Sequence, residues 1–260
     1  MTAPPSTLDL SRTALFLDID GTMLDIAPTP AEVLVPAGLG ETLSGLSRRC
    51  GGALAVISGR TIEDIDRLFA PNRFPAAGIH GAQLRAAPNG GIDHLSRPMP
   101  ESLRAHFASV ASAHPGAFVE DKGVTLALHY RLSEHPVLDH EHVALLEREA
   151  EAAGFTILHG KKVLELKPKG VSKGAAIRAF MQHPPFASRI PVFAGDDWTD
   201  AHGFAVLAGL KGFGIAVGAR FEDAQYCIPR PEDFRLWLES LLSNAASAPE
   251  PALRPRVSSG

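Results

Sequence analysis

Four short apolar runs constrain the fold of this chain more than any other feature. They occupy 14–17, 53–57, 190–194 and 214–217. Runs this short do not suit buried helices, and their lack of polar and apolar alternation predicts strands that are covered on both faces. Apolar residues recur with helical spacing at 39–50, 172–181 and 234–242. This succession of strands and helices predicts an α/β core built on a parallel sheet.

The middle of the chain has a different pattern, in which a helix precedes each of two pairs of short strands. The strands are expected at 117–120, 124–130, 155–159 and 163–166. Adjacent strand pairs are typical of antiparallel hairpins. We therefore predict a Rossmann-like parallel-sheet core over 1–91 and 167–246, with an inserted α+β domain over 92–166. The first ten residues and the tail at 247–260 are rich in Pro, Ala and Ser, so we expect both ends to be frayed and the tail to be disordered.

Composition excludes several classes of protein. The 260 residues carry a net charge of −4, which argues against non-specific binding to nucleic acid or to anionic membranes. No apolar run approaches the roughly 20 residues of a transmembrane helix, and no signal peptide is visible. Cys50 and Cys227 are too few for a disulfide framework or a zinc site. We expect a cytoplasmic protein, by default a monomer, with neither nucleic acid nor membrane as a partner.

Two clusters of aspartates follow strands of the predicted core. The clusters are Asp18 with Asp20, and Asp196 with Asp197 and Asp200. Ligands of open α/β sheets bind beyond the carboxyl ends of the strands, so the two clusters are expected to meet there. Gathered carboxylates repel one another unless a cation or proton lies among them, and oxygen ligands favour Mg²⁺. Taken alone, the first cluster also fits a turn, and Asp197 or Asp200 also fits a helix N-cap.

Two further elements carry groups that suit a phosphate. Ser58, Gly59 and Arg60 follow the strand at 53–57 and offer a hydroxyl and backbone N–H groups at a helix start. Lys173 lies in the first turn of the helix that is predicted to begin after Ser172, where the helix dipole disfavours a cation. A lysine at this position indicates a nearby anion, although it also fits a solvated surface lysine.

The order of these motifs resembles that of the haloacid dehalogenase (HAD) phosphatase superfamily. Within it, six segments resemble the signature of the trehalose-6-phosphate phosphatases: 78–81, 119–122, 128–131, 164–168, 172–174 and 195–200. The resemblance spans about 13–242. Two positions depart from the pattern, because Met23 replaces a common Leu and Ala201 replaces the usual Glu. The second change removes a carboxylate next to the expected metal site.

The resemblance implies a HAD core with a cap domain that hydrolyses trehalose 6-phosphate through an aspartyl-phosphate, in trehalose biosynthesis. Asp18 would be the nucleophile and Asp20 the general acid and base. Mg²⁺ would be held by Asp18, Asp20 (through its backbone carbonyl) and Asp196. The other catalytic residues would be Ser58, Lys173 and Asp200. The residues implied to bind this phosphosugar are Gly59, Arg60, His80, Glu120, Lys122, Arg131 and Glu165.

Two alternative functions remain open at this point. Another capped sugar phosphatase or a phosphomutase, acting on sucrose phosphate or a hexose phosphate, would share every core motif, and only the cap residues argue against it. A non-catalytic phosphosugar-binding module would be expected to lack Asp18 or Asp20, and both are present. Each charged cap residue, taken singly, also fits a solvated ion pair on a hairpin.

Overall fold

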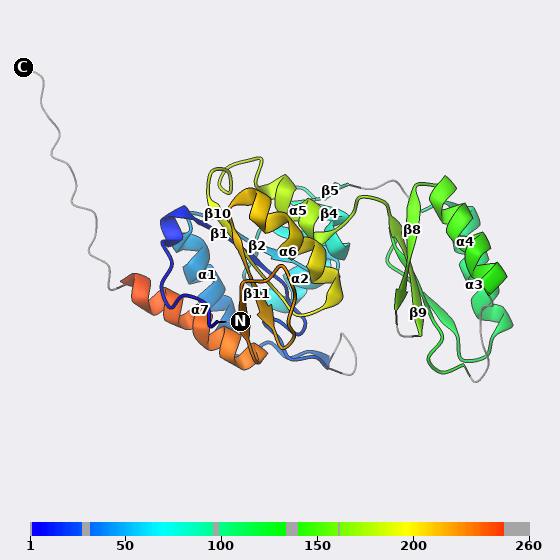
Figure 1. The fold of residues 1–260 in the computed structure, drawn as a ribbon, viewed down its shortest axis with the longest axis horizontal. Coiled ribbons are helices and arrows are strands. Elements are labelled where there is room, and N and C mark those ends of the chain that lie inside the picture. Colours follow the sequence, from blue (N-terminus) through cyan, green and yellow to red (C-terminus); the bar gives the residue numbers. More distant parts are fainter. Residues whose placement is uncertain (1, 28–31, 96–98, 134–139, 161, 247–260) are drawn as a thin grey trace, which may run out of the picture.

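The computed structural model describes residues 2–27, 32–95, 99–133, 140–160 and 162–246 (Figure 1). Within these residues, eight strands form one sheet and four strands form a second, separate sheet. None of the helices in the described stretches combines the length and apolar character needed to cross a membrane. The tail at 247–260, for which we expected disorder, lies outside the described residues.

The larger sheet forms the core. Its strands are β1 (Thr13–Leu17), β2 (Leu54–Ile57), β3 (Ala76–Gly78), β4 (Gln83–Arg85), β5 (Asp93–His94), β10 (Ile190–Gly195), β11 (Phe213–Val217) and β12 (Tyr226–Ile228). They lie in the order β12-β11-β10-β1-β2-β3-β4-β5. The first six in this order are parallel, and β4 and β5 are antiparallel additions at one edge. The prediction of a parallel α/β core is confirmed.

The four strands predicted for the core are β1, β2, β10 and β11. β1 is central and is buried at every residue, which explains why its sequence shows no alternation. On one side, Phe16 stacks against Phe186 with ring centroids 5.5 Å apart, and Phe180 packs beside both rings. The strands that were not predicted have two or three residues each, too few to show a hydrophobic pattern.

Helices cover both faces of the core sheet. They are α1 (Leu39–Arg49), α2 (Ile62–Phe69), α5 (Lys173–Phe180), α6 (Ala201–Leu207) and α7 (Pro231–Ala246). α1 packs against α7, and α5 packs against α6 (Figure 1). Short 3-10 turns lie at Leu10–Arg12, Ile79–Gly81, Trp198–Asp200 and Ala208–Leu210.

The expectation that the first ten residues are frayed is wrong for the described residues from Thr2 onward. Thr2 forms a bridge with Tyr226, and the indole Nε1 of Trp237 donates a hydrogen bond of 2.8 Å to the carbonyl of Pro5. Leu10 is buried in the core. A Pro-rich segment keeps its carbonyl acceptors and its apolar rings, so it can pack along a helix even though it shows no periodicity of its own.

The smaller sheet is antiparallel and carries its helices on one face only. Its strands are β6 (Phe118–Asp121), β7 (Leu126–His129), β8 (Phe155–Gly160) and β9 (Val163–Pro168), in the order β6-β7-β9-β8. α3 (Glu101–Ala113) and α4 (His140–Ala152) lie on the side away from the core (Figure 1). Alternate residues of the strands, such as Leu128 and Leu166, are buried with Phe107 and Leu146 from these helices. The opposite face of the sheet therefore looks toward the core.

The chain passes between the two sheets at two places. β5 still pairs with β4 of the core, and the next described element is α3 of the smaller unit. On the return, β9 ends at Pro168 and α5 of the core begins at Lys173. The sequence division at 91/92 and 166/167 placed 93–94 in the inserted domain and 167–168 in the core. In the structure β5 (Asp93–His94) pairs with β4 of the core, and β9 of the smaller sheet continues to Pro168.

Candidate active site

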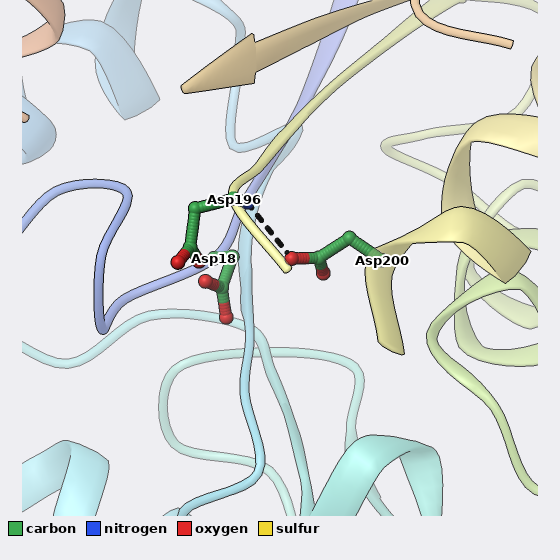
Figure 2. Close-up of side chains that lie close together, drawn as sticks. All are labelled: Asp18, Asp196 and Asp200. Carbon is green, nitrogen blue, oxygen red and sulfur yellow. Dashed lines mark hydrogen bonds between the residues drawn. The ribbon is translucent and has the colours of Figure 1, made fainter. Parts of the chain in front are cut away.

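The carboxyl ends of β1 and β10 bring three aspartates together. The two strands pair in parallel, with Leu17 opposite Ala194, so the residues that follow them emerge side by side. Asp18, Asp196 and Asp200 each offer an oxygen, and these oxygens lie within 4.8 Å of one another (Figure 2). Aspartates that are 182 residues apart at the extremes thus share one site at the sheet edge where ligands of such sheets bind.

A buried lysine separates two of these carboxylates. Lys173 is the first residue of α5, after the N-cap Ser172, and only 3% of its side chain is exposed. Its Nζ lies 2.6 Å from Asp18 Oδ1 and 2.6 Å from Asp200 Oδ1. The carboxylates of Asp18 and Asp200 therefore compensate the unfavourable position of this cation at a helix N-terminus. Burial opposes the charge, but Asp18 and Asp200 outweigh it and hold the pKa of Lys173 above its usual range.

Asp200 organises the loop after β10. Its Oδ2 accepts hydrogen bonds from the backbone N–H groups of Asp196, at 2.9 Å, and of Asp197, at 3.1 Å (Figure 2). Asp197 in turn caps the 198–200 turn by accepting from Thr199 N, so the N-cap interpretation of Asp197 is confirmed. Ala201, which follows this network, begins α6 and is exposed.

Thr22 is a site residue that the sequence reasoning did not select. It is fully buried, and its Oγ1 lies 3.0 Å from Asp18 Oδ2 and 3.2 Å from Asp196 Oδ1. Gly21 adopts φ +82°, and a Cβ there would lie 2.0 Å from Asp196 Oδ2. The turn after β1 therefore places the Thr22 hydroxyl against the carboxylates of Asp18 and Asp196, and Gly21 leaves room for the carboxylate of Asp196. The only signal was the Thr that follows Asp-x-Asp-Gly.

Crowding and burial make the carboxylates hold protons more tightly than free aspartate. Burial raises the pKa of Asp18 to about 7, against the attraction of Lys173. Burial, followed by repulsion from Asp200, raises the pKa of Asp196 to about 6. Burial and repulsion from Asp18 raise the pKa of Asp200 to about 7. Three carboxylates with one lysine leave a negative site of oxygen ligands only, which fits a hard divalent cation.

These shifts predict how stability depends on pH. A carboxylate whose folded pKa is raised destabilises the folded state as pH rises from about 4 through that pKa. Without metal, the melting temperature is expected to fall between about pH 5 and about pH 7.5, where folded Asp18 and Asp200 still hold protons that the unfolded chain has released. Added Mg²⁺ should raise it more at pH 8 than at pH 6.5, since metal and protons compete for the same oxygens. Differential scanning calorimetry measures both effects.

The matched control for this prediction is Asp196→Asn, which removes one ligand and one of the like charges. It should lose most of the stabilisation by Mg²⁺ and should show a shallower fall in melting temperature. A metal-free melting temperature that rises from about pH 5 to about pH 7.5 would contradict the assignment of raised pKa values.

Arg60 pairs with Asp20 at the end of β2. The guanidinium donates to both carboxylate oxygens, from Nε to Oδ2 and from Nη2 to Oδ1, each at 2.7 Å. This hydrogen bonding raises the pKa of Arg60. Ser58 is buried, and its Oγ accepts a hydrogen bond of 3.1 Å from the backbone N–H of Arg60. In this conformation Arg60 binds the Asp20 carboxylate, which is itself partly exposed.

His80 packs between the core and the smaller sheet. A Cβ on Gly59 would lie 2.6 Å from His80 Nε2, so only glycine at this position leaves room for the imidazole ring. Ile79 and His80 both have positive φ, 50° and 54°, conformations that non-glycine residues adopt only when their surroundings enforce them. Burial lowers the pKa of His80 to about 3, so its ring is neutral at pH 7. Its Nε2 lies 3.9 Å from Glu165 Oε1 of β9.

A cavity of about 990 Å³ joins these groups to the smaller sheet. The core lines it with Asp18, Asp20, Ser58, Gly59, Arg60, His80, Lys173 and Asp196, and the smaller sheet lines it with Glu120, Asp121 and Lys122. Glu165 reaches the site beside His80, and burial raises its pKa. Arg131 lies in an exposed turn after β7 and does not line the cavity. Glu165 does not line the cavity either, but its Oε1 lies 3.9 Å from Nε2 of His80, which does.

The parallel-sheet core, the aspartates and buried lysine at its carboxyl edge, and the inserted α+β unit over them define a capped phosphatase of the HAD type. A sequence model of the trehalose-phosphatase family matches residues 16–225. The chain belongs to the trehalose-phosphatase family, as the motifs predicted. The smaller unit is accordingly called the cap from here on.

Individual relatives agree with this assignment. The chain is 40% identical over 246 residues to a trehalose-6-phosphate phosphatase from Escherichia coli (strain K12), covering 93% of this chain and 91% of that protein. It is 42% identical over 213 residues to a probable trehalose-phosphate phosphatase from Sinorhizobium fredii, covering 81% and 79%. The C-terminal domain of a Candida albicans trehalose-6-phosphate phosphatase superimposes with a TM-score of 0.74 at 21% identity, covering 93% of this chain and 98% of that one, and shares the fold.

Proposed function

We propose that this protein hydrolyses trehalose 6-phosphate to trehalose and inorganic phosphate, with Mg²⁺ as its cofactor. The observation that carries the proposal is the cavity that joins Asp18 and Lys173 of the core to Glu120 and Lys122 of the cap. One end suits a phosphate and the other offers hydrogen-bonding groups for sugar hydroxyls. A cytoplasmic location, a phosphosugar as the partner and a place in trehalose biosynthesis belong to the same proposal.

In the first step, an oxygen of Asp18 attacks the phosphorus, and the bond from phosphorus to the sugar oxygen breaks. A carboxylate and a phosphate dianion at about 4 Å repel by several kcal/mol at an effective dielectric near 20. Lys173, 2.6 Å from Asp18, offsets part of this repulsion. Asp20 donates a proton to the leaving oxygen, so trehalose departs as an alcohol.

In the second step, Asp20 takes a proton from water, the water oxygen bonds to phosphorus, and the bond from phosphorus to Asp18 breaks. Inorganic phosphate leaves and Asp18 regains its carboxylate. Arg60 donates a hydrogen bond to each oxygen of Asp20. The acid role in the first step therefore requires this ion pair to loosen as the phosphosugar enters.

The oxygen-only cluster fits Mg²⁺, which we propose is held by Asp18, Asp196 and the backbone carbonyl of Asp20. When bound, Mg²⁺ supplies positive charge that lowers the repulsion between the carboxylate and the phosphate. Thr22 contacts both carboxylates and thereby fixes their spacing.

Phosphate release from a panel of substrates tests the proposed function. The panel contains trehalose 6-phosphate, sucrose 6-phosphate, glucose 6-phosphate and mannose phosphates, each with and without Mg²⁺ after chelation. We expect kcat/KM to be highest for trehalose 6-phosphate and activity to require the metal. A higher kcat/KM for a hexose phosphate would favour a different capped sugar phosphatase, and full activity after chelation would remove Mg²⁺ from the proposal.

Glu165→Ala is expected to lower kcat/KM for trehalose 6-phosphate by at least about tenfold, the loss of one charge-assisted hydrogen bond. The substitution should lower kcat/KM much less for an aryl phosphate, because an aryl phosphate has no sugar hydroxyls. Glu147→Ala is the matched control. Glu147 also belongs to the cap, but it lies on the outer helix α4 and pairs with His159 of β8. Equal losses for both substrates would show that Glu165 supports the cap rather than the sugar.

A further inference from the structure

The open face of the cap sheet extends beyond the cavity. Phe118 and Glu120 are two residues apart on β6, so they share a face of the sheet, and Lys122 continues the same spacing. Glu120 and Lys122 line the cavity, whereas Phe118 is the next position outward. Phe118 is 53% exposed, so about half of this large aromatic side chain is open to solvent on the face that looks toward the core.

Phe118 is held in place by His129 of β7. The two residues are directly opposite in the sheet register, and their rings stack with centroids 4.7 Å apart and planes 16° from parallel. His129 covers one face of the phenyl ring, and the exposed fraction of Phe118 leaves other ring surface open to a ligand.

His129 also orients the nearest carboxylate of the cavity. Its Nε2 lies 3.1 Å from Glu120 Oε2, and Lys122 Nζ lies 3.5 Å from Glu120 Oε1. Both oxygens of Glu120 are therefore fixed from two sides. A flat apolar ring surface and a fixed carboxylate stand next to each other on one sheet face, joined through a single histidine.

We propose that Phe118 and His129 form a platform for the distal ring of a phosphorylated disaccharide, the sugar ring that does not carry the phosphate, and that His129 is a positioning residue for Glu120. The proposal rests on the proposed function. A pyranose ring has C–H groups on its faces and hydroxyls at its rim, so it matches an aromatic surface bordered by a hydrogen-bonding carboxylate. If the phosphate binds beside Asp18 and the first ring lies beside Lys122 and Glu120, which line the same cavity, Phe118 outside that lining would be left for the second ring.

Kinetics of Phe118 variants test the platform. Phe118→Ala is expected to lower the ratio of kcat/KM for trehalose 6-phosphate to kcat/KM for an aryl phosphate by about fivefold, mainly through a higher KM. Phe118→Tyr keeps the ring and should restore most of the ratio. Leu236→Ala, which removes a 58% exposed side chain on α7 of the core, should leave the ratio as in the wild type. An unchanged ratio in Phe118→Ala would overturn the platform.

Two variants of His129 separate its two roles. His129→Gln keeps a hydrogen-bond donor for Glu120 without the aromatic stack, and His129→Phe keeps the stack without the donor. Both should lower the same ratio at an unchanged melting temperature. A fall in melting temperature with no change in the ratio would give His129 a purely structural role and overturn the positioning proposal.

The same measurements distinguish failure of this inference from failure of the proposed function. If the wild type prefers sucrose 6-phosphate, trehalose 6-phosphate is not the substrate, and the Phe118→Ala loss should appear with sucrose 6-phosphate instead. If the wild type hydrolyses trehalose 6-phosphate best and Phe118→Ala leaves the ratio of the two kcat/KM values unchanged, only the platform fails. If it prefers a hexose phosphate, which has no second ring, both fail.

Discussion

Asp18→Asn is expected to reduce kcat for trehalose 6-phosphate by at least about 10⁴-fold while the fold survives. The amide has nearly the shape of the carboxylate, but its oxygen is a poor nucleophile. It can still accept from Lys173, which lies 2.6 Å from Asp18 Oδ1. It also removes the Asp18 charge that, after burial, raises the pKa of Asp200. The melting temperature should therefore be unchanged or higher, and calorimetry beside steady-state kinetics checks both expectations.

The control for Asp18→Asn is Asp25→Asn. Asp25 lies shortly after the same strand, but its side chain is 70% exposed and pairs with Arg235. That variant should keep near wild-type kcat. If Asp18→Asn retained more than a tenth of the wild-type rate at an unchanged melting temperature, the covalent mechanism would be wrong.

Lys173→Met is the second change with a large expected effect, of at least about 10³-fold in kcat. It should also destabilise the metal-free protein by about 3–5 kcal/mol at pH 8, because the cation is removed from between buried carboxylates. At pH 6 the loss of stability should be smaller. Without Lys173 the pKa values of Asp18 and Asp200 rise further, so these groups bind protons in the folded state and remain neutral at the lower pH.

Lys169→Met provides the comparison, since Lys169 is four residues earlier, half-exposed and paired with Glu151 at the surface. It should change neither kcat nor stability by much. Denaturant unfolding at pH 6 and pH 8 measures the difference for both variants. An equal loss of stability at the two pH values for Lys173→Met would contradict the charged state assigned to the three carboxylates.

The sequence predicted the positions of site residues that directly follow core strands, and it did not predict contacts that depend on side-chain conformation or strand register. Asp18 and Asp196 end neighbouring parallel strands, so recognising the strands was enough to bring them together. The pairing of Arg60 with Asp20 depends on two side-chain conformations, and no spacing along the chain encodes them. The orientation of Glu120 by His129 depends on the register of β6 with β7, which the sequence of a short hairpin leaves open.

Among the strands of the fold, too, only those with a pattern in their own sequence were predicted. β1, β2, β10 and β11 were predictable because they are buried over all or nearly all of their length, which favours apolar residues at successive positions. The strands at the edges, β3, β4, β5 and β12, add hydrogen bonds to a sheet that already exists, so their own sequences need little strand propensity. The packed N-terminal segment was missed for a related reason, because its contacts come from α7 and β12 rather than from its own pattern.

The return from cap to core has little slack. Glu165 of the cap and Lys173 of the core are eight residues apart, with a glycine turn at Gly170 between β9 and α5. One short stretch of chain thus connects a carboxylate beside His80 to the buried lysine between Asp18 and Asp200. Any change in the orientation of the cap would have to be accommodated within the few residues before α5.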